Sequence, residues 1–391
     1  MRISRADRSR LAEWWFTVDT VLLSAILVLV AAGLVLSLAA SPAVAIKKGY
    51  ETFYFFERHV AFSVVAVPMM LAISLLEPQA VRRLALAVLL VAFVGLLAVA
   101  LTGPEINGAR RWLVVAGHSL QPSELAKPAL VVVAAWLFAE TGRRPDMPAL
   151  GLAVGLLAAL VGLLVAQPDI GQSLLVAMVW GALYFLSGQS LLGGAALAVT
   201  GVAGLVGAYL SFPHVQGRID RFLVPSAGDN SQVDRAMQSF SEGGFFGRGP
   251  GEGQIKSVLP DAHTDFIFAV VAEEYGVAAC LALLLLLGFI VMRALARSFT
   301  EPDPATRLSI QGLALLFGLQ ALINMAVNVG LAPAKGMTLP FISSGGSSML
   351  GVAMLLGMLL ALTRRRPHSI RMRRPPPTVA LPAQGERKAS P

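Results

Sequence analysis

Charged residues are scarce in this sequence. They make up 14% of its 391 residues, whereas 56% are hydrophobic, and soluble domains carry roughly 25% charged residues. A soluble fold of this length would need far more polar surface, so the composition excludes one. The hydrophobic residues fall in blocks of roughly 20, the length of a helix that spans a hydrocarbon core about 30 Å thick. Because lipid offers the backbone no hydrogen-bond partner, these blocks predict membrane helices.

Cysteine is nearly absent, since Cys280 is the only one. A single cysteine excludes a disulfide within the chain and a metal site built on several thiolates. The five histidines also lack the spacing of zinc ligands. The net charge of +8 would suit a nucleic acid, but the basic residues lie mainly in short loops beside the apolar blocks. Membrane topology accounts for that placement, so we expect no nucleic-acid partner.

The apolar blocks predict an all-α, polytopic membrane protein of about ten transmembrane helices. The blocks cover roughly residues 19–41, 59–76, 84–102, 124–139, 148–166, 171–187, 190–212, 264–292, 307–331 and 342–363. Ala43-Val44-Ala45 resembles a signal-peptide cleavage site, but the apolar run before it is longer than a typical signal core. We therefore expect an uncleaved first helix.

Orientation follows from the basic residues in the loops, because cytoplasmic loops carry an excess of Lys and Arg. With ten helices both termini lie on one side, which the basic residues predict to be cytoplasmic. Residues 1–18 then form a cytoplasmic tail, 19–363 a transmembrane catalytic domain, and 364–391 a basic, proline-containing cytoplasmic tail that is predicted to be disordered. The basic residues of this side are Arg2, Arg5, Arg8, Arg10, Arg82, Arg83, Arg143, Arg144, Arg293, Arg297 and Arg307, followed by those of the tail.

Long polar segments lie on the opposite, outer side. They cover residues 103–123, 213–263 and 332–346, and 213–263 forms a large outer loop between the seventh and eighth helices. Its glycine-rich run 243–253 predicts irregular backbone and close approach of neighbouring segments. Long polar loops that gather on one face usually carry the function.

Glu124 and Lys127 are ionisable residues in the fourth apolar block. They lie three residues apart, so they share one helix face, and a charge at the bilayer centre costs about 2.5–3.5 kcal/mol. One interpretation is a self-neutralising pair near the interface that anchors the helix. The other, which we favour, is a pair that lines a polar cavity in which Lys127 meets an anionic ligand.

Asp265 stands where the large outer loop meets an apolar block. A carboxylate beside hydrocarbon but within reach of water has a raised pKa and suits general-base chemistry. The alternative is that Thr264 or Asp265 simply caps the following helix, and the sequence leaves both readings open. Glu273 and Glu274 lie about two turns further into that helix, so at least one of them should face a protein interior.

A set of basic residues on the outer side goes against the inside bias. Some are expected to be solvated loop charges, but together they predict an electropositive outer surface suited to a phosphate or pyrophosphate. The set comprises Arg110, Arg111, Arg218, Arg221, Arg235, Arg248, Lys256 and Lys335.

Five motifs, in order along the chain, resemble those of the SEDS family (shape, elongation, division and sporulation) of ten-helix bacterial peptidoglycan polymerases. They cover residues 107–112, 121–127, 167–172, 259–266 with Glu273 and Glu274, and 324–348. Within the family, residues 330–340, which include Lys335, are most similar to the cell-division member. One departure is the stretch 239–244, where many members have a small-residue run ending Gly-Ser-Gly-Gly, and it leaves the local loop conformation open.

The resemblance implies an inverting glycosyltransferase that polymerises lipid II, an undecaprenyl-pyrophosphate disaccharide-pentapeptide. It implies Asp265 as the catalytic acid residue, acting as general base for the acceptor hydroxyl. Lys127, Arg111 and Lys335 would steady the pyrophosphate, and a divalent cation such as Mg2+ could share that task. The remaining substrate-binding residues implied by the motifs are Glu124, His263, Thr264 and Ser344.

The resemblance also implies partners and a place of action. These are a class B penicillin-binding protein (the septal transpeptidase), other divisome proteins, and the bacterial cytoplasmic (inner) membrane at the division septum. Two other functions stay open. A lipid II flippase would need polar groups along the whole crossing, and the outer half of this chain is richer in them. A non-enzymatic scaffold would recruit division proteins through its basic tail.

Overall fold

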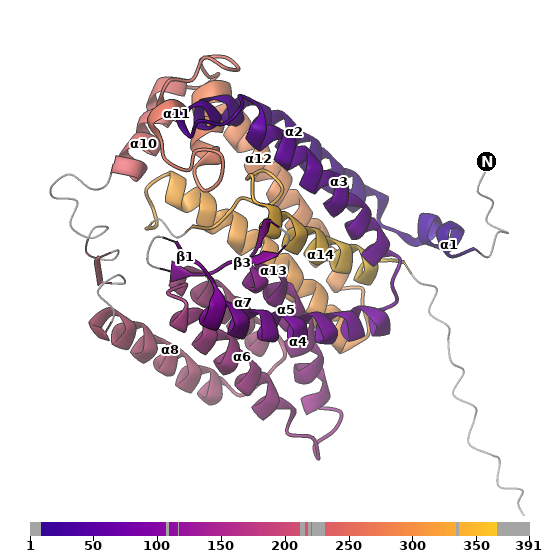
Figure 1. Ribbon diagram of the computed structural model, residues 1–391. Coiled ribbons are helices and arrows are strands. Elements are labelled where there is room, and N and C mark those ends of the chain that lie inside the picture. Colours follow the sequence, from indigo (N-terminus) through magenta and orange to yellow (C-terminus); the bar gives the residue numbers. More distant parts are fainter. Residues whose placement is uncertain are drawn as a thin grey trace, which may run out of the picture.

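Ten apolar helices form one bundle in the computed structural model, which describes residues 9–106, 109–115, 117–211, 216–217, 220, 231–333 and 336–365 (Figure 1). Eight of the helices are long and apolar enough to cross a membrane, and α7 and α14 are shorter apolar helices. Each predicted apolar block corresponds to one helix, so the all-α, polytopic membrane fold is confirmed. The helices are α2 (Thr20–Lys47), α3 (Tyr54–Ser74), α4 (Pro78–Thr102), α5 (Pro122–Thr141), α6 (Ala149–Ala166), α7 (Ile170–Leu186), α8 (Leu191–Ser211), α12 (Ile267–Ser298), α13 (Pro304–Asn328) and α14 (Gly346–Leu362).

Smaller elements lie outside these spans. They are α1 (Arg10–Thr17), α10 (Ser231–Gly243) and α11 (Ile255–Val258), the last two within the large outer loop. The outer segment 103–123 also holds four short strands that the sequence analysis did not predict. β1 (Glu105–Ile106) pairs with β2 (Ala109–Arg110), and β3 (Leu113–Val115) pairs with β4 (His118–Leu120), both antiparallel. Such ribbons pair backbone groups that have no helix to satisfy them.

The centre of the bundle is formed by α5, α13 and α14. α5 packs against α4, α13 and α14, and α14 also packs against α3. Most of α5 and α13 is buried inside the protein, whereas Ala208 is the only buried residue of α8. Figure 1 shows α8 at the lower left edge of the bundle, where it packs mainly against α7. Polar side chains on α5 and α13 are therefore enclosed by protein.

The first and last described segments of the chain meet at one end of the bundle. The Arg364 guanidinium, just after α14, donates to the Thr17 hydroxyl at 2.9 Å and to the Leu75 carbonyl at 3.1 Å. The Arg365 N–H donates to the Thr17 carbonyl at 2.8 Å. In Figure 1 α1 lies at the right, away from α10 and α11 at the upper left. This arrangement agrees with an even number of spans and separates the end with the termini from the end with the large loop.

α12 is broken near its outer end. Gly276 has φ 77° and ψ 177°, which are not helical angles. Such a φ costs glycine little, because glycine has no Cβ to clash. The break divides α12 into a short outer piece that follows Asp265 and a long inner piece that spans the membrane.

The glycine-rich run 243–253 satisfies the backbone groups that the break leaves unpaired. The N–H groups of Arg248 and Gly249 donate to the carbonyls of Glu273 and Glu274 at 2.9 and 3.0 Å. After the break, the N–H groups of residues 277 and 278 donate back to carbonyls of this run. The expected close backbone approach is therefore present, and it ties the outer loop to the piece of α12 next to Asp265.

Gly276→Ala is expected to lower the thermal stability of the protein. A Cβ at this position would lie 2.3 Å from the Phe245 carbonyl oxygen, and the positive φ adds strain of about 1–3 kcal/mol. Gly288→Ala is the matched control in the same helix, because nothing lies within 4 Å of its added Cβ. Melting temperatures of the purified variants in detergent would check the difference. Equal melting temperatures would mean that the break does not depend on glycine.

Candidate active site

Asp265 lies in the segment that leads into α12, before the first helical residue. Its side chain is half-buried. α12 is capped by Phe266 without any side-chain cap hydrogen bond, so the alternative that Thr264 or Asp265 caps this helix is wrong. Within the described residues no hydrogen bond or ion pair engages the Asp265 carboxylate. The carboxylate is therefore available to a ligand.

Two asparagines of α13 hold the backbone of Asp265. The side-chain amides of Asn324 and Asn328 each donate to the Asp265 carbonyl oxygen at 2.9 Å. Asn324 also donates to the Met337 carbonyl at 2.6 Å, and the Asn328 side-chain oxygen accepts from the Ala269 N–H at 3.1 Å. Both asparagines are buried. They fix the place from which the carboxylate extends.

The loop before α14 packs against the same segment. The Ser343 hydroxyl donates to the Thr264 carbonyl at 2.6 Å, and the Ser344 N–H donates to the His263 carbonyl at 2.9 Å. Gly336, in the same loop, faces Asp265, since a Cβ there would lie 3.7 Å from the carboxylate. Three chain segments that are distant in sequence thus meet around one acid.

Strained backbone is found on both sides of this contact. Asp261 has φ 53° and Phe341 has φ 59°, in the left-handed region that non-glycine residues rarely adopt. Such residues persist only where the surrounding structure over-determines them, and they cluster at active sites. Gly33 of α2 allows the Phe341 backbone to approach closely, because a Cβ at Gly33 would lie 2.0 Å from the Phe341 carbonyl oxygen.

Burial raises the pKa of Asp265 to about 7. The neighbouring charge of Asp261 raises the pKa further, while the positive charge of Arg111 lowers it. The first cause dominates because a charge is poorly solvated among protein atoms. A carboxylate with this pKa is partly ionised at neutral pH and is a stronger base than an ordinary aspartate.

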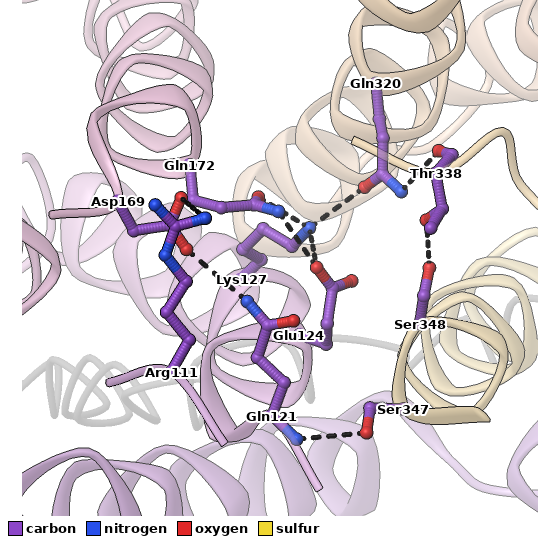
Figure 2. Close-up of polar contacts among 10 residues, drawn as sticks. All are labelled: Arg111, Gln121, Glu124, Lys127, Asp169, Gln172, Gln320, Thr338, Ser347 and Ser348. Atoms are coloured by element: carbon purple, nitrogen blue, oxygen red, sulfur yellow. Dashed lines mark hydrogen bonds and ion pairs between the residues drawn. The ribbon is translucent and has the colours of Figure 1, made fainter. Parts of the chain in front are cut away.

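Lys127 lies beneath this region in a buried network of three helices (Figure 2). Its ammonium group donates to the side-chain oxygens of Glu124 and Gln172, both at 2.9 Å, and of Gln320 at 3.1 Å. Gln172 also donates to Glu124 at 3.0 Å. Lys127 is only 2% exposed. The Glu124–Lys127 pair is therefore not an interfacial anchor but an internal ion pair. Lys127 also lines a small pocket whose other lining residues are apolar.

Arg111 approaches the site from the outer ribbon segment. Figure 2 shows its guanidinium beside Asp169, at 3.9 Å, and it also donates to the Pro168 carbonyl. Its Nε is buried and has no hydrogen-bond partner among the residues that the structure describes. Burial raises the pKa of Asp169 even though Arg111 and Lys127 oppose that shift.

A stripe of amides on α13 connects the Lys127 network with Asp265. Gln320, Asn324 and Asn328 are spaced four residues apart and are all buried. Gln320 binds Lys127 and also donates to the Thr338 carbonyl at 3.3 Å. The sequence analysis missed the roles of Gln320 and Asn328. The signal was three amides at helical spacing within one apolar block, which places them on one face.

The other predicted site residues fall in different surroundings. His263 is buried against the Phe55 ring, with ring centroids 4.2 Å apart, and burial lowers its pKa to about 4. The Thr264 hydroxyl donates to the Asp261 carbonyl, and the Ser344 hydroxyl lies 3.5 Å from a ring nitrogen of His59. Lys335 lies outside the described residues.

Five of the predicted outer basic residues lie within the described ranges, and the prediction of a free electropositive surface is wrong for the three of them that pair with acids beside the large loop and the ribbon. Lys256 is buried and pairs with Glu274. Arg110 and Arg248 pair with acidic neighbours, and Arg235 donates to the Val258 carbonyl. Sequence places such cations on the outer side but does not reveal which carboxylate folds back onto them. Arg218 and Arg221 lie outside the described residues.

Glu273 and Glu274 are both buried, as expected for at least one of them. The Glu273 carboxylate accepts three backbone N–H groups, from Gln254, Ile255 and Lys256, at 2.6, 2.6 and 3.0 Å. The two acids therefore organise the outer loop and are not free for chemistry.

The described residues do not fit a resident metal ion. No group of three or more histidine, cysteine, aspartate or glutamate side chains in the described ranges could hold one. Asp265 is a single carboxylate, and its neighbour Asp261 is exposed.

Known proteins are similar to this chain over most of its length. The model of a family described as cell cycle proteins, which comprises FtsW, RodA and SpoVE, matches residues 19–368. A protein of Caulobacter vibrioides named probable peptidoglycan glycosyltransferase FtsW is 44% identical over 370 residues, which cover 93% of this chain and 94% of that protein. A protein of the same name from Trichlorobacter lovleyi is 35% identical over 365 residues, with 90% and 94% covered.

Solved structures with a similar fold are also known. A chain from a peptidoglycan synthase complex, described as coordinating polymerization and crosslinking, has a TM-score of 0.73 and 28% identity, covering 88% of this chain and 97% of that one. The crystal structure of the rod shape determining protein RodA of Thermus thermophilus has a TM-score of 0.63 and 27% identity, covering 89% and 97%.

Proposed function

This chain belongs to the FtsW, RodA and SpoVE family of cell cycle proteins, and we propose from that premise and from the site that it is the peptidoglycan glycosyltransferase of cell division, polymerising lipid II into glycan strands. The similarity to relatives named FtsW supports the division role. The observation that carries the chemical proposal is the Asp265 carboxylate, which has no hydrogen-bond or ion-pair partner among the described residues and whose pKa burial raises to about 7.

Asp265 acts as the general base of the transfer. Its carboxylate takes the proton from an acceptor sugar hydroxyl, and the oxygen of that hydroxyl forms a bond to the anomeric carbon of the donor. The bond from that carbon to the pyrophosphate oxygen breaks, and undecaprenyl pyrophosphate leaves with the bonding electron pair. Attack from the face opposite the leaving group inverts the anomeric configuration. A base whose pKa lies near the working pH is best suited to this proton transfer.

Arg111 and Lys127 favour departure of the pyrophosphate. Negative charge grows on the leaving group in the transition state, and fixed positive charges nearby stabilise it. Arg111 can contribute directly, because its Nε has no partner among the described residues. Lys127 acts through its charge, since its ammonium is already bound by three side-chain oxygens. Lys335 would add a third cation, by the resemblance of its motif.

The remaining predicted residues shape the site. Glu124 pairs with Lys127 in the protein interior, and Thr264 and Ser344 belong to the two segments that meet around Asp265. His263, which stays neutral at pH 7 because burial lowers its pKa, packs behind that segment. A divalent cation has no ready-made ligand group among the described residues.

Its place of action follows from the orientation. We infer that the basic end, where α1 and the end of α14 meet, is cytoplasmic, so that Asp265 faces the outer side of the bacterial cytoplasmic membrane at the septum. A class B penicillin-binding protein is the expected partner, because a similar solved chain belongs to a complex that couples polymerization to crosslinking.

Purified protein incubated with lipid II, alone and with its transpeptidase, tests this function. Glycan strands should form and should be degraded by a muramidase. Reconstitution of the same protein into liposomes, with lipid II on one leaflet, tests the flippase alternative. Translocation of lipid II without any polymer would overturn the proposed enzyme. A deletion of the tail after residue 365 tests the scaffold alternative. That alternative predicts that function is lost with the tail and is kept when residues of the outer site are replaced.

Polymerisation should depend on pH through Asp265. The base works in its ionised form, and burial raises its pKa to about 7. The ratio kcat/KM should therefore rise as pH increases from 5.5 to 8, with a midpoint of about 7, and not at the ordinary aspartate value near 4. Initial rates over this range check the prediction. A flat profile would remove Asp265 from the proton transfer.

A further inference from the structure

An aromatic cluster lies beside the catalytic segment, in the short connection between α2 and α3. The Tyr50 and Tyr54 rings stack with centroids 4.5 Å apart and planes 12° apart. The Phe55 ring meets both at their edges, 6.0 Å from Tyr50 and 5.2 Å from Tyr54. Tyr50 is 50% exposed. We call Tyr50, Tyr54 and Phe55 the aromatic platform.

Two cations border the platform. The Lys48 ammonium lies 5.6 Å from the Phe55 ring centroid, and the Arg58 guanidinium lies 5.7 Å from that of Tyr54. Both cations are exposed. Contacts at these distances hold a cation over a ring while leaving its other donors to solvent or to a ligand. The platform therefore combines a flat apolar surface with positive charge at its rim.

The backbone under the platform is held in one conformation. The Tyr50 N–H donates to the Ala45 carbonyl at 2.9 Å, and Gly49 turns the chain with φ 74°. The Ser41 hydroxyl accepts from the Phe56 N–H at 3.1 Å and lies 3.4 Å from the Thr52 carbonyl. A surface fixed in this way can bind a ligand without first paying to order itself.

The platform is continuous with the segment that carries Asp265. The Phe55 ring contacts His263, two residues before the base, with centroids 4.2 Å apart. On the same side, Lys48 lies 4.0 Å from Asp261, whose charge acts on the Asp265 carboxyl. The platform therefore adjoins the segment that carries the base.

We propose that the aromatic platform is a subsite for the sugar–peptide unit of the glycan strand, next to the reacting sugar. The proposal rests on the glycosyltransferase function proposed above. The C–H bonds of a pyranose ring form a flat apolar face that packs against an aromatic face, while its hydroxyls stay in water. The peptide attached to each muramic acid carries carboxylates, which Lys48 and Arg58 complement in charge.

The alternative is that these rings belong to the aromatic belt of a membrane protein, where Tyr side chains sit at the interface and contact lipid head groups. The geometry favours the subsite, because the rings form one interlocked cluster that abuts the catalytic segment. Phe246 provides the comparison, because it is 82% exposed in the outer loop and its ring contacts that of Phe245.

Tyr50→Leu, Tyr50→Phe and Phe246→Leu test the proposal with purified protein and lipid II. Leucine keeps an apolar side chain for the interface but removes the ring, whereas phenylalanine keeps the ring. Tyr50→Leu should raise KM for lipid II and shorten the product strands about threefold to tenfold, the range that corresponds to one aromatic contact. Tyr50→Phe should lie closer to the parent than Tyr50→Leu does, and Phe246→Leu should behave like the parent.

Direct binding provides a readout that does not depend on catalysis. A soluble oligosaccharide-peptide fragment, released from peptidoglycan by lysozyme, is titrated into the Asp265→Asn protein in nanodiscs, with and without Tyr50→Leu. The Tyr50 substitution should weaken binding by the same factor. Equal binding and equal strand length in the two cases would overturn the platform proposal.

The outcomes also separate the platform from the proposed function. Loss of polymer in Asp265→Asn together with unchanged kinetics in Tyr50→Leu refutes the platform alone and assigns its rings to the membrane interface. Polymerisation that survives in Asp265→Asn refutes the proposed mechanism, whatever the platform does. Equal loss in Tyr50→Leu and Phe246→Leu would also overturn the subsite, because Tyr50 belongs to the platform that contacts the catalytic segment through Phe55, whereas Phe246 lies outside the platform.

Discussion

Asp265→Asn should reduce polymerisation of lipid II by about 10²–10⁴-fold, the usual contribution of a general base. The amide has nearly the shape of the carboxyl but does not accept the proton of the acceptor hydroxyl. The backbone of residue 265 should stay in place, because Asn324 and Asn328 hold its carbonyl oxygen rather than its side chain. Initial rates of strand formation by the purified variant measure the loss.

The same substitution should stabilise the protein, and more strongly at high pH. The pKa of Asp265 is raised on folding, from near 4 to about 7. A carboxyl of this kind contributes most to stability at low pH, where it is protonated in both states, and that contribution is lost as pH rises through about 7. The melting temperature of Asp265→Asn should therefore exceed that of the parent at pH 8 by more than at pH 5.5.

The combined result identifies the residue as functional. A variant that loses activity because it misfolds would melt at a lower temperature, whereas this one should melt at a higher temperature and still be inactive. Asp303→Asn is a matched control, because Asp303 pairs with Arg143 and caps α13, which lowers its pKa despite the opposing effect of burial. That variant should lose stability and keep its activity. A lower melting temperature of Asp265→Asn would contradict the claim that the Asp265 carboxylate has no stabilising partner among the described residues.

Lys127→Met should destabilise the protein by about 3–5 kcal/mol, because it leaves the Glu124 carboxylate buried without its cation. Replacing both charges, in Glu124→Gln with Lys127→Met, should recover most of that loss, since a neutral pair has no unpaired charge to bury. Melting temperatures of the two variants measure the difference. Arg144→Met is the control, because the 71% exposed Arg144 side chain pairs with Glu140 at the surface, where such pairs contribute little.

The double variant also tests the role of Lys127 in catalysis. If the charge of Lys127 stabilises the departing pyrophosphate, the double variant should fold and yet polymerise lipid II about 10²-fold or more slowly. Polymerisation at the rate of the parent would limit the Glu124–Lys127 pair to a structural role. That outcome would leave the assignment of Asp265 untouched, because the Lys127 network reaches the loop before α14 through Gln320 and makes no hydrogen bond to the Asp265 side chain among the described residues.

The helices were predictable because apolar runs of membrane length have no other stable conformation in lipid. The sequence showed each of the ten runs, including α5 with its ionisable residues. It did not show the short strands between residues 105 and 120, since elements of two or three residues are too short for an alternating pattern. The break at Gly276 was hidden for a related reason, because one glycine in an apolar run does not reveal its φ.

Asp265 was identifiable because an acid beside an apolar run requires an explanation. The sequence did not show how the other charged residues pair. Lys256 looked like an outer cation, yet the chain returns it to Glu274 across 18 residues. Gln320 and Asn328 were overlooked because uncharged amides do not stand out by charge. Their importance comes from burial, which makes each unsatisfied amide costly and each satisfied one a fixed support.

Formate rescue of Asp265→Ala tests most directly whether this carboxylate accepts the proton. Removal of the side chain leaves room for a small carboxylate beside Gly336, and formate at that position can take the proton instead. The variant should form no measurable polymer alone, and its rate should rise with formate concentration while that of the parent does not. Strand formation by Asp265→Ala at the rate of the parent, without formate, would contradict the role of Asp265 as the base.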